Sequence, residues 1–202
     1  MKIKICGITR LEDALCAVEH GADMLGFIFY QKSKRYISPE NAAEIITGIP
    51  GHIETVGVFV NAASDELISV AETSGITTMQ LHGDEDESIL PALSKWQIIK
   101  AFALKDVSDL AKLDTFQSSR ILIDSVSAEH GGSGIEADWN LASAAAKKRE
   151  IILAGGLNAG NIEAAIRLVN PYGIDLSSGL EKEPGIKDPE KIKLFALEMK
   201  NL

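Results

Sequence analysis

Residues 4–10 read KICGITR, a strand pattern that passes directly into a turn and the start of a helix. The alternating apolar pattern runs up to Cys6 and stops at the glycine that follows it. Thr9 and Glu12 have the spacing of a capping box, which predicts that a helix begins at once. A thiol at such a turn is well placed for chemistry, although free cysteine is also often buried for packing alone.

The same alternation of strand and helix patterns continues along the chain. Apolar and β-branched runs predict eight strands, at residues 2–5, 24–29, 55–60, 77–81, 98–102, 121–124, 151–154 and 173–176. Helical patterns follow them at residues 11–20, 40–47, 64–73, 85–94, 107–113, 139–148, 160–169 and 189–199. The first of these helices places Leu11, Ala14, Leu15 and Val18 on one face, which predicts the face that packs on the sheet.

Strand-helix units about 25 residues apart indicate a parallel sheet with right-handed crossovers. The strands read as continuous apolar runs, which is typical of strands buried on both faces. We therefore predict an α/β fold: a single (β/α)8 TIM barrel of eight parallel strands, with residues 1–202 forming one domain. A doubly wound open sheet is the alternative, but it usually has fewer strands, and the first loop lacks the G-x-G-x-x-G pattern.

The composition and net charge of the chain exclude some classes of ligand. The chain has 202 residues, a net charge of −9 and a pI near 5.0, and it shows no basic face of the kind that binds nucleic acid. No apolar run approaches the roughly 18 residues of a membrane span, and no secretory signal is evident. Two cysteines make no disulfide framework, so a reducing, cytoplasmic setting is expected. Small molecules or other proteins remain as partners.

In a barrel of this kind, active sites lie at the carboxyl ends of the strands. Cys6 ends the first predicted strand, and Asp124 ends the sixth, before the glycine-rich loop SVSAEHGGSG at residues 125–134. A partly desolvated carboxyl group can act as a general acid, and a thiol near positive charge is partly ionised and can act as a base. We therefore predict that Cys6 and Asp124 form a base–acid pair. The alternative for Asp124 is a helix cap or an ion-pair partner.

Three further polar residues lie at or beyond the ends of predicted strands. Arg35 lies in a loop with Lys32 and Lys34, where its fork of donors suits a carboxylate, although a loop arginine is also an ordinary surface charge. His82 is the one histidine at a strand end, and Asp175 lies in the last predicted strand. We predict that Arg35, His82 and Asp175 bind substrate.

Two short glycine-containing stretches follow the seventh and eighth predicted strands. One contains Gly155 and Gly156, and the other contains Ser177, Ser178 and Gly179. Loops at these positions frequently bind phosphate in this fold, because glycine lets backbone N–H groups approach an anion. We predict a phosphate site there; the alternative is that both stretches are ordinary turns. No grouping of His, Asp and Glu has the spacing of metal ligands, so no metal is expected.

Several stretches taken in chain order closely resemble the phosphoribosylanthranilate isomerase family of tryptophan biosynthesis. They are KICGIT, FIFYQKSKRYI, QLHGDE, LIDS with GGSG, LAGGLN, and IDLSSGLE with PGIKD. The resemblance implies a (β/α)8 barrel without a cofactor that catalyses the Amadori rearrangement of N-(5-phosphoribosyl)anthranilate to 1-(2-carboxyphenylamino)-1-deoxyribulose 5-phosphate. It also implies Cys6 as the general base, Asp124 as the general acid, Arg35 as the ligand of the anthranilate carboxylate, and the glycine loops as the phosphate site.

Two other functions stay open on the sequence alone. A sugar-phosphate epimerase or aldolase could share the barrel and the phosphate site, and Lys100 is the one interior candidate for the Schiff base of an aldolase. A ligand-binding barrel without turnover would keep the phosphate site but would have no need of Cys6 or Asp124. In every case we expect a phosphorylated small molecule as the partner. We expect the protein itself to be a monomer or a homodimer.

Overall fold

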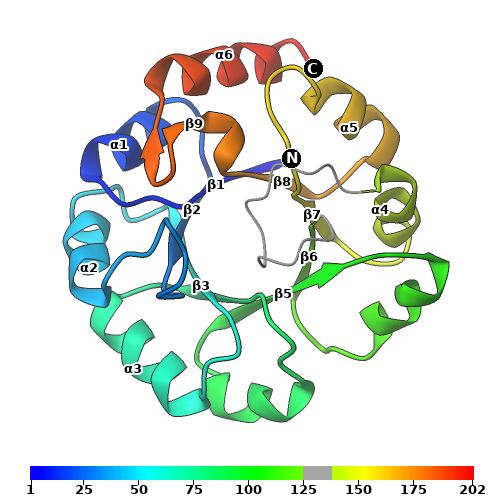
Figure 1. The fold of residues 1–202 in the computed structure, drawn as a ribbon, viewed down its shortest axis with the longest axis horizontal. Coiled ribbons are helices and arrows are strands. Elements are labelled where there is room, and N and C mark those ends of the chain that lie inside the picture. The colour runs from blue at the N-terminus through cyan, green and yellow to red at the C-terminus, as the bar shows by residue number, and fades with distance from the viewer. Residues whose placement is uncertain (125–137) are drawn as a thin grey trace.

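Eight parallel strands pair in chain order and close into a barrel, with β8 hydrogen-bonded to β1 (Figure 1). The computed structural model describes residues 1–124 and 138–202. The strands are β1 (Lys2–Cys6), β2 (Met24–Ile28), β3 (Glu54–Phe59), β4 (Thr78–Leu81), β5 (Gln97–Ala103), β6 (Arg120–Asp124), β7 (Ile151–Leu153) and β8 (Gly173–Leu176). This confirms the predicted α/β class and the (β/α)8 architecture. The predicted glycine-rich loop at residues 125–134 lies outside the described residues.

The strands are mostly apolar because each side of the barrel wall is buried. One cluster of buried side chains comes from alternate positions of five strand regions and lies in the barrel interior; it consists of Met24, Val56, Ile99, Ala101, Leu122, Ile152 and Ala154. A larger cluster lies between the outer side of the strands and the surrounding helices. Polar side chains that point inward are therefore exceptions to the interior pattern, and they mark the candidate site.

Helices surround the barrel on its outer side (Figure 1). They are α1 (Leu11–Glu19), α2 (Pro39–Thr47), α3 (Ser64–Ser74), α4 (Trp139–Ala146), α5 (Ile162–Val169) and α6 (Pro189–Lys200). The capping residues predicted before proline are confirmed: Ser38 accepts a hydrogen bond at the start of α2, and Asp188 does so at the start of α6. In the described part of the chain, no helix combines the length and the hydropathy needed to span a bilayer.

The helical segments after β4 and β5 differ from the expected α-helices. Both Glu87–Leu93 and Val107–Asp114 are 3₁₀-helices, and the first contains Pro91. A proline lacks the N–H group that an interior α-helical turn requires, which accounts for the tighter winding of this short segment.

Two details of the first helix correct the sequence interpretation. Arg10 is the N-cap of α1 and makes no side-chain capping bond, so the predicted capping box is wrong. Thr9 instead donates its hydroxyl hydrogen to the carbonyl oxygen of Gly185, which ties the loop after β1 to the C-terminal part of the chain. The predicted apolar face is also wrong in part, because Leu11 and Leu15 are 38% and 44% exposed while Ala14 is buried.

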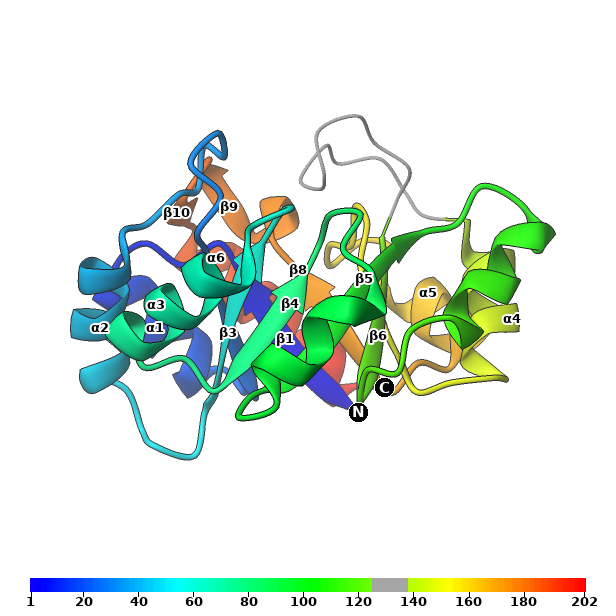
Figure 2. The ribbon, with the colours of Figure 1, turned by 90° about the horizontal axis from the view of Figure 1, so that it is seen from below.

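A small hairpin follows the last barrel strand and was not predicted. After a 3₁₀ turn at Ser178–Leu180, β9 (Glu181–Glu183) pairs antiparallel with β10 (Ile186–Lys187). Figure 2 shows this hairpin at the end of the barrel opposite the N-terminus, which is the end where the strands finish. The hairpin therefore adds its buried residues to the rim on which the predicted site residues lie.

Candidate active site

Cys6 is the last residue of β1, and its thiol is nearly buried at the rim of the barrel. It pairs in register with Gly26 on β2, and a β-carbon on Gly26 would lie only 2.6 Å from the Cys6 sulfur. The absence of a side chain at position 26 thus creates the space that the thiol occupies. Burial raises the pKa of the Cys6 thiol, and this effect outweighs the opposing influence of the Lys4 and Lys187 ammonium groups.

Lys4 lies two residues before Cys6 on the same inward face of β1 and has no exposed surface. Its ammonium group donates to the Asp175 carboxylate of β8 at 2.9 Å, and its positive charge lowers the pKa of the Cys6 thiol. Burial alone would lower the pKa of Lys4, but Asp175 and Cys6 together raise it. At Asp175 the balance is reversed: burial raises the pKa of this carboxyl group despite its pairing with Lys4. The second carboxylate oxygen of Asp175 is buried and has no hydrogen-bond partner among the described residues.

Asp124, at the end of β6, lies against His82, which follows β4. The Nε2 atom of His82 is 3.2 Å from an oxygen of Asp124. The Nδ1 atom of the same ring is 2.7 Å from the amide nitrogen of Gln80, so both ring nitrogens have partners. Asp124 and His82 are also close enough to Asp175 for their charges to act on its pKa. The structure thus brings three of the predicted residues, Asp124, His82 and Asp175, into one neighbourhood.

Arg35 is held by a carboxylate that the sequence interpretation had overlooked. Its Nε and Nη2 atoms donate to Glu181 on β9 at 2.7–3.1 Å in a two-pronged pair. Lys187 on β10 donates to the same carboxylate at 3.0 Å. These two cations lower the pKa of Glu181 although burial would raise it. Because the pair uses Nε and Nη2, the Nη1 edge of Arg35 is not part of it.

The two predicted phosphate loops contact each other directly. Gly155 and Gly156 both have positive φ angles, of 87° and 67°, which L-amino acids with side chains rarely adopt. Gly179, in the 3₁₀ turn after β8, packs so closely that a β-carbon on it would lie 2.1 Å from the carbonyl oxygen of Leu157. The neighbouring Ser177 hydroxyl is buried and has no partner among the described residues. The close packing fixes the spacing of the two loops.

Replacing Gly179 by alanine is expected to push these loops apart, because the clash is with a backbone atom that has little freedom to move. We expect the KM for a phosphorylated substrate to rise about 10-fold or more, as one or more hydrogen bonds to a charged group are lost. Steady-state kinetics and thermal unfolding measure the two effects. Gly51→Ala is the matched control, because a β-carbon there meets nothing within 4 Å. An unchanged KM in Gly179→Ala would place phosphate binding elsewhere.

Lys100 is buried, but its side chain does not point into the barrel. The prediction that Lys100 is an interior candidate for a Schiff base is therefore wrong. Lys100 lies between Ile99 and Ala101, which both point into the barrel, so its own side chain points outward. There it donates to Glu85 at 2.8 Å and to the carbonyl oxygen of Gly83 at 2.6 Å. This ion pair ties β5 to the loop after β4.

Four site residues were missed from the sequence: Lys4, Gln80, Glu181 and Lys187. Two of them carried a usable signal, because Lys4 and Gln80 lie two positions before Cys6 and His82 and thus share their face of the barrel wall. Glu181 and Lys187 carried no such signal, since they meet only when the short hairpin after β8 forms.

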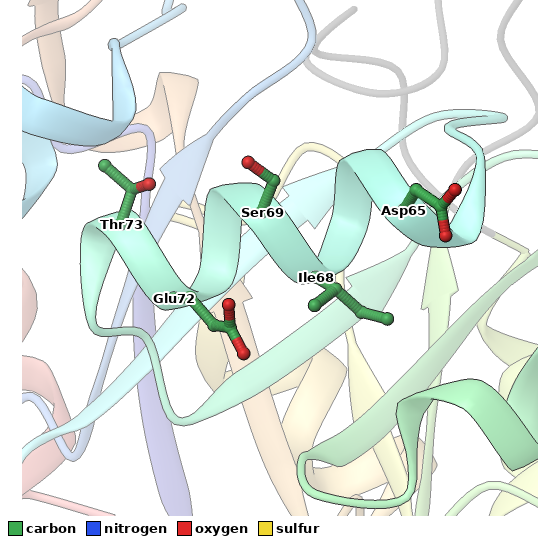
Figure 3. A pocket seen from close by; sticks show the side chains of 5 residues that line it. All are labelled: Asp65, Ile68, Ser69, Glu72 and Thr73. Atoms are coloured by element: carbon green, nitrogen blue, oxygen red, sulfur yellow. The ribbon is translucent and has the colours of Figure 1, made fainter.

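A surface pocket elsewhere on the molecule has a different character. It is lined by Asp65, Ile68, Ser69, Glu72 and Thr73, all from α3 on the outer side of the barrel (Figure 3). None of the predicted site residues lines it. Within residues 1–124 and 138–202, no group of three or more His, Cys, Asp or Glu side chains is arranged to hold a metal ion.

A closed (β/α)8 barrel whose strand ends carry a thiol, a carboxyl–imidazole pair and paired glycine loops has the organisation of a barrel enzyme. A family model described as N-(5'phosphoribosyl)anthranilate (PRA) isomerase matches residues 3–198. The chain belongs to this family. It is an isomerase of tryptophan biosynthesis, as the sequence resemblance implied.

Named relatives and solved structures of this family align with the whole chain. The N-(5'-phosphoribosyl)anthranilate isomerase of Citrifermentans bemidjiense is 47% identical over 202 residues, which span 100% of this chain and 98% of the relative. Monomers generated from the dimeric phosphoribosylanthranilate isomerase of Thermotoga maritima are 39% identical, with a TM-score of 0.89 and complete coverage of both chains. A further isomerase with the same identity, TM-score and coverage was solved in complex with reduced 1-(o-carboxyphenylamino)-1-deoxyribulose 5-phosphate.

Proposed function

We propose that this chain isomerises N-(5'-phosphoribosyl)anthranilate at the carboxyl end of its barrel, with Cys6 as the general base and Asp124 as the general acid. The observation that carries the proposal is the placement of these two groups in a chain of this family. Cys6 has a cation and a carboxylate beneath it, and Asp124 has an imidazole beside it. A base and an acid in different surroundings are what a proton-transfer isomerisation needs.

The reaction then proceeds by two proton transfers. The protonated Asp124 carboxyl group gives its proton to the ribose ring oxygen as the bond from that oxygen to C1′ breaks, which leaves a protonated Schiff base between C1′ and the anthranilate nitrogen. The Cys6 thiolate removes the proton from C2′, and the electron pair forms an enolamine. The enolamine tautomerises to the ketone, and the proton on the thiol returns to Asp124 through solvent. Each transfer contributes about 10²–10⁴-fold to the rate.

The remaining predicted residues hold the substrate. The phosphate lies against the loops with Gly155, Gly156, Ser177, Ser178 and Gly179, where two positive-φ glycines leave the backbone open to an anion. The second carboxylate oxygen of Asp175 can accept a hydrogen bond from a sugar hydroxyl. Both ring nitrogens of His82 have protein partners, so this residue meets the substrate with its ring face or through Asp124.

Arg35 binds the anthranilate carboxylate with its Nη1 edge and its charge, while Glu181 holds the rest of the guanidinium. Arg35→Ala is expected to raise KM about 10- to 100-fold, which corresponds to a lost hydrogen bond between charged groups. Arg35→Lys keeps the charge but loses the fork, so we expect it to recover only part of the affinity. The measurement is KM for the substrate and for an analogue without the carboxylate. If Arg35→Ala weakens binding of both compounds equally, Arg35 does not contact the carboxylate.

Residues 1–202 act in this proposal as one catalytic domain in the cytoplasm, without a cofactor, as a monomer or homodimer. One related isomerase was solved in complex with reduced 1-(o-carboxyphenylamino)-1-deoxyribulose 5-phosphate, and another is a dimeric protein. The first relative supports a phosphorylated small molecule as the partner, and the second is consistent with a homodimer.

The test is turnover by the purified chain. Freshly formed N-(5'-phosphoribosyl)anthranilate loses its fluorescence as it is converted, and the product is identified by mass spectrometry and by its reduction with borohydride. Loss of fluorescence in proportion to enzyme concentration supports the proposal. Saturable binding of the substrate without conversion would make the chain a binding protein and overturn it.

A further inference from the structure

We propose that Lys4 is a positioning residue for the reaction, which favours the thiolate form of Cys6 from inside the barrel, while Asp175 in turn holds Lys4. The inference deepens the proposed function and rests on it, because it gives Cys6 the role of the base. It extends the site downward from the rim by one layer of inward-pointing residues, to Lys4, whose side chain has no exposed surface.

The contacts of Lys4 fit this role. An ammonium group has three N–H donors, and Lys4 directs one to Asp175 at 2.9 Å, while its charge acts on the Cys6 thiol. Lys4 and Asp175 lie in direct register on the adjacent strands β1 and β8, so the backbone pairing itself sets their distance. Lys4 and Cys6 are two positions apart on one strand, which points both side chains to the same face. The three groups are thus aligned by the sheet and not by flexible loops.

Stability alone does not account for Lys4. The buried cluster in the barrel interior is apolar, and replacing a buried ion pair by apolar residues of similar size is often neutral or stabilising. A buried lysine also loses its hydration, and that loss lowers the pKa unless charges nearby oppose it. Asp175 and Cys6 do oppose it, and the pKa of Lys4 is raised. An interior lysine that remains charged next to a thiol suits the stabilisation of a negative sulfur.

Among the charged groups around Cys6, Lys4 is the cation that we expect to stabilise the thiolate most. Lys187 and Arg35 also act on the thiol electrostatically, and Asp175 opposes them. Lys187 and Arg35 are both committed to Glu181, at 3.0 Å and at 2.7–3.1 Å. Lys4, by contrast, shares the inward face of β1 with Cys6, and it is the cation with the largest influence on the thiol.

The experiment titrates the thiol directly, in the absence of substrate. Cys16 is the other free thiol, so a Cys16→Ser background confines the signal to Cys6. Thiolate absorbance in the ultraviolet and the rate of alkylation by iodoacetamide are followed against pH, with and without Lys4→Met. Removal of one neighbouring opposite charge is expected to move the midpoint upward by about one to three pH units. The acid limb of the kcat/KM profile should move with it, while KM stays within a few-fold. An unmoved midpoint in a folded Lys4→Met protein would overturn the inference.

Lys100→Met is the matched control. It also removes a buried lysine from an ion pair, with Glu85 at 2.8 Å, but on the outer side of the barrel wall, and we expect the Cys6 midpoint to stay in place. If Lys4→Met fails to fold, the double variant Lys4→Met with Asp175→Asn removes both charges of the pair together, and a smaller upward shift is expected, because Asp175 itself raises the pKa of the thiol. An equal shift in Lys100→Met would show a general effect of destabilisation and overturn the inference.

Failure of this inference and failure of the proposed function give different results. If Cys6→Ser is inactive but the midpoint does not move in Lys4→Met, the base assignment stands and the role of Lys4 is overturned. If Cys6→Ser keeps normal turnover, the base assignment is wrong, and the inference about Lys4 falls with it.

Discussion

Replacing Cys6 by serine is expected to lower kcat about 10²–10⁴-fold, the usual contribution of one general base, while KM stays within a few-fold of the wild-type value. Serine fits the space that Gly26 leaves for the thiol, so the binding groups around it keep their places. Its hydroxyl group, however, is not ionised near neutral pH, so it cannot replace a thiolate as the base. The expected loss is therefore chemical and not a loss of binding, and steady-state kinetics separates the two.

The isotope effect of a substrate deuterated at C2′ gives this variant a distinctive signature. Proton removal from C2′ becomes the slow step in Cys6→Ser, so we expect the deuterium effect on kcat to be larger than in the wild type. Cys16→Ser is the control, because that thiol lies on α1, where its sulfur is 3.9 Å from Nδ1 of His20. Near-normal turnover by Cys6→Ser, or a smaller isotope effect, would remove Cys6 as the base.

The pH dependence follows from the same assignment. A base acts only in its deprotonated form, so kcat/KM should rise with pH through the pKa of the thiol. Burial raises that pKa above its ordinary value, which places the rise on the alkaline side of an unperturbed cysteine. The dependence should vanish in Cys6→Ser.

The barrel could be predicted from the sequence because its strands are short, continuous apolar runs separated by regular helical patterns. The predicted seventh strand ended at residue 154 and the structure ends it at Leu153, and the other strand ends agree as closely. The type of helix was harder to predict, since 3₁₀- and α-helices have similar apolar spacing over one or two turns. The packed face of α1 was misread because small side chains such as Ala14, and not its leucines, face the barrel.

The site was predictable where chemistry follows a strand end and less so where it depends on contacts between distant strands. Lys4 looked like part of an ordinary strand, because a lysine near a chain start is usually solvated. Only closure of the barrel places it beside Asp175, 171 positions later. Glu181 likewise reaches Arg35 across 146 positions through a hairpin too short to show a strand pattern.

These contacts give the two reacting groups different partners. Cys6 is next to a buried cation, which favours its negative form. Asp124 instead faces an imidazole ring whose other nitrogen is fixed by Gln80. An isomerase that uses one group as base and another as acid needs this difference, since two identical environments would drive both groups to the same protonation state.

Asp124→Asn tests the acid side of that difference, and its expected effect is a fall in kcat of about 10²–10⁴-fold. Asparagine has the same shape and keeps an oxygen that can accept from His82, but it cannot deliver a proton to the ribose ring oxygen. Ring opening then becomes the slow step, and it precedes the removal of the C2′ proton. We therefore expect the deuterium effect at C2′ to disappear in Asp124→Asn, whereas it grows in Cys6→Ser.

Asp65→Asn is the matched control, and His82→Ala tests the partner of Asp124. Asp65 is an exposed carboxylate on α3, outside the site, and its replacement should leave kcat and the isotope effect unchanged. If His82 acts through Asp124, as their distance of 3.2 Å indicates, His82→Ala lowers kcat by less than Asp124→Asn and also reduces the isotope effect. If His82 instead binds the substrate, KM rises and the isotope effect stays. Should Asp124→Asn retain the wild-type isotope effect, ring opening does not depend on this carboxyl group, and another residue must supply the proton.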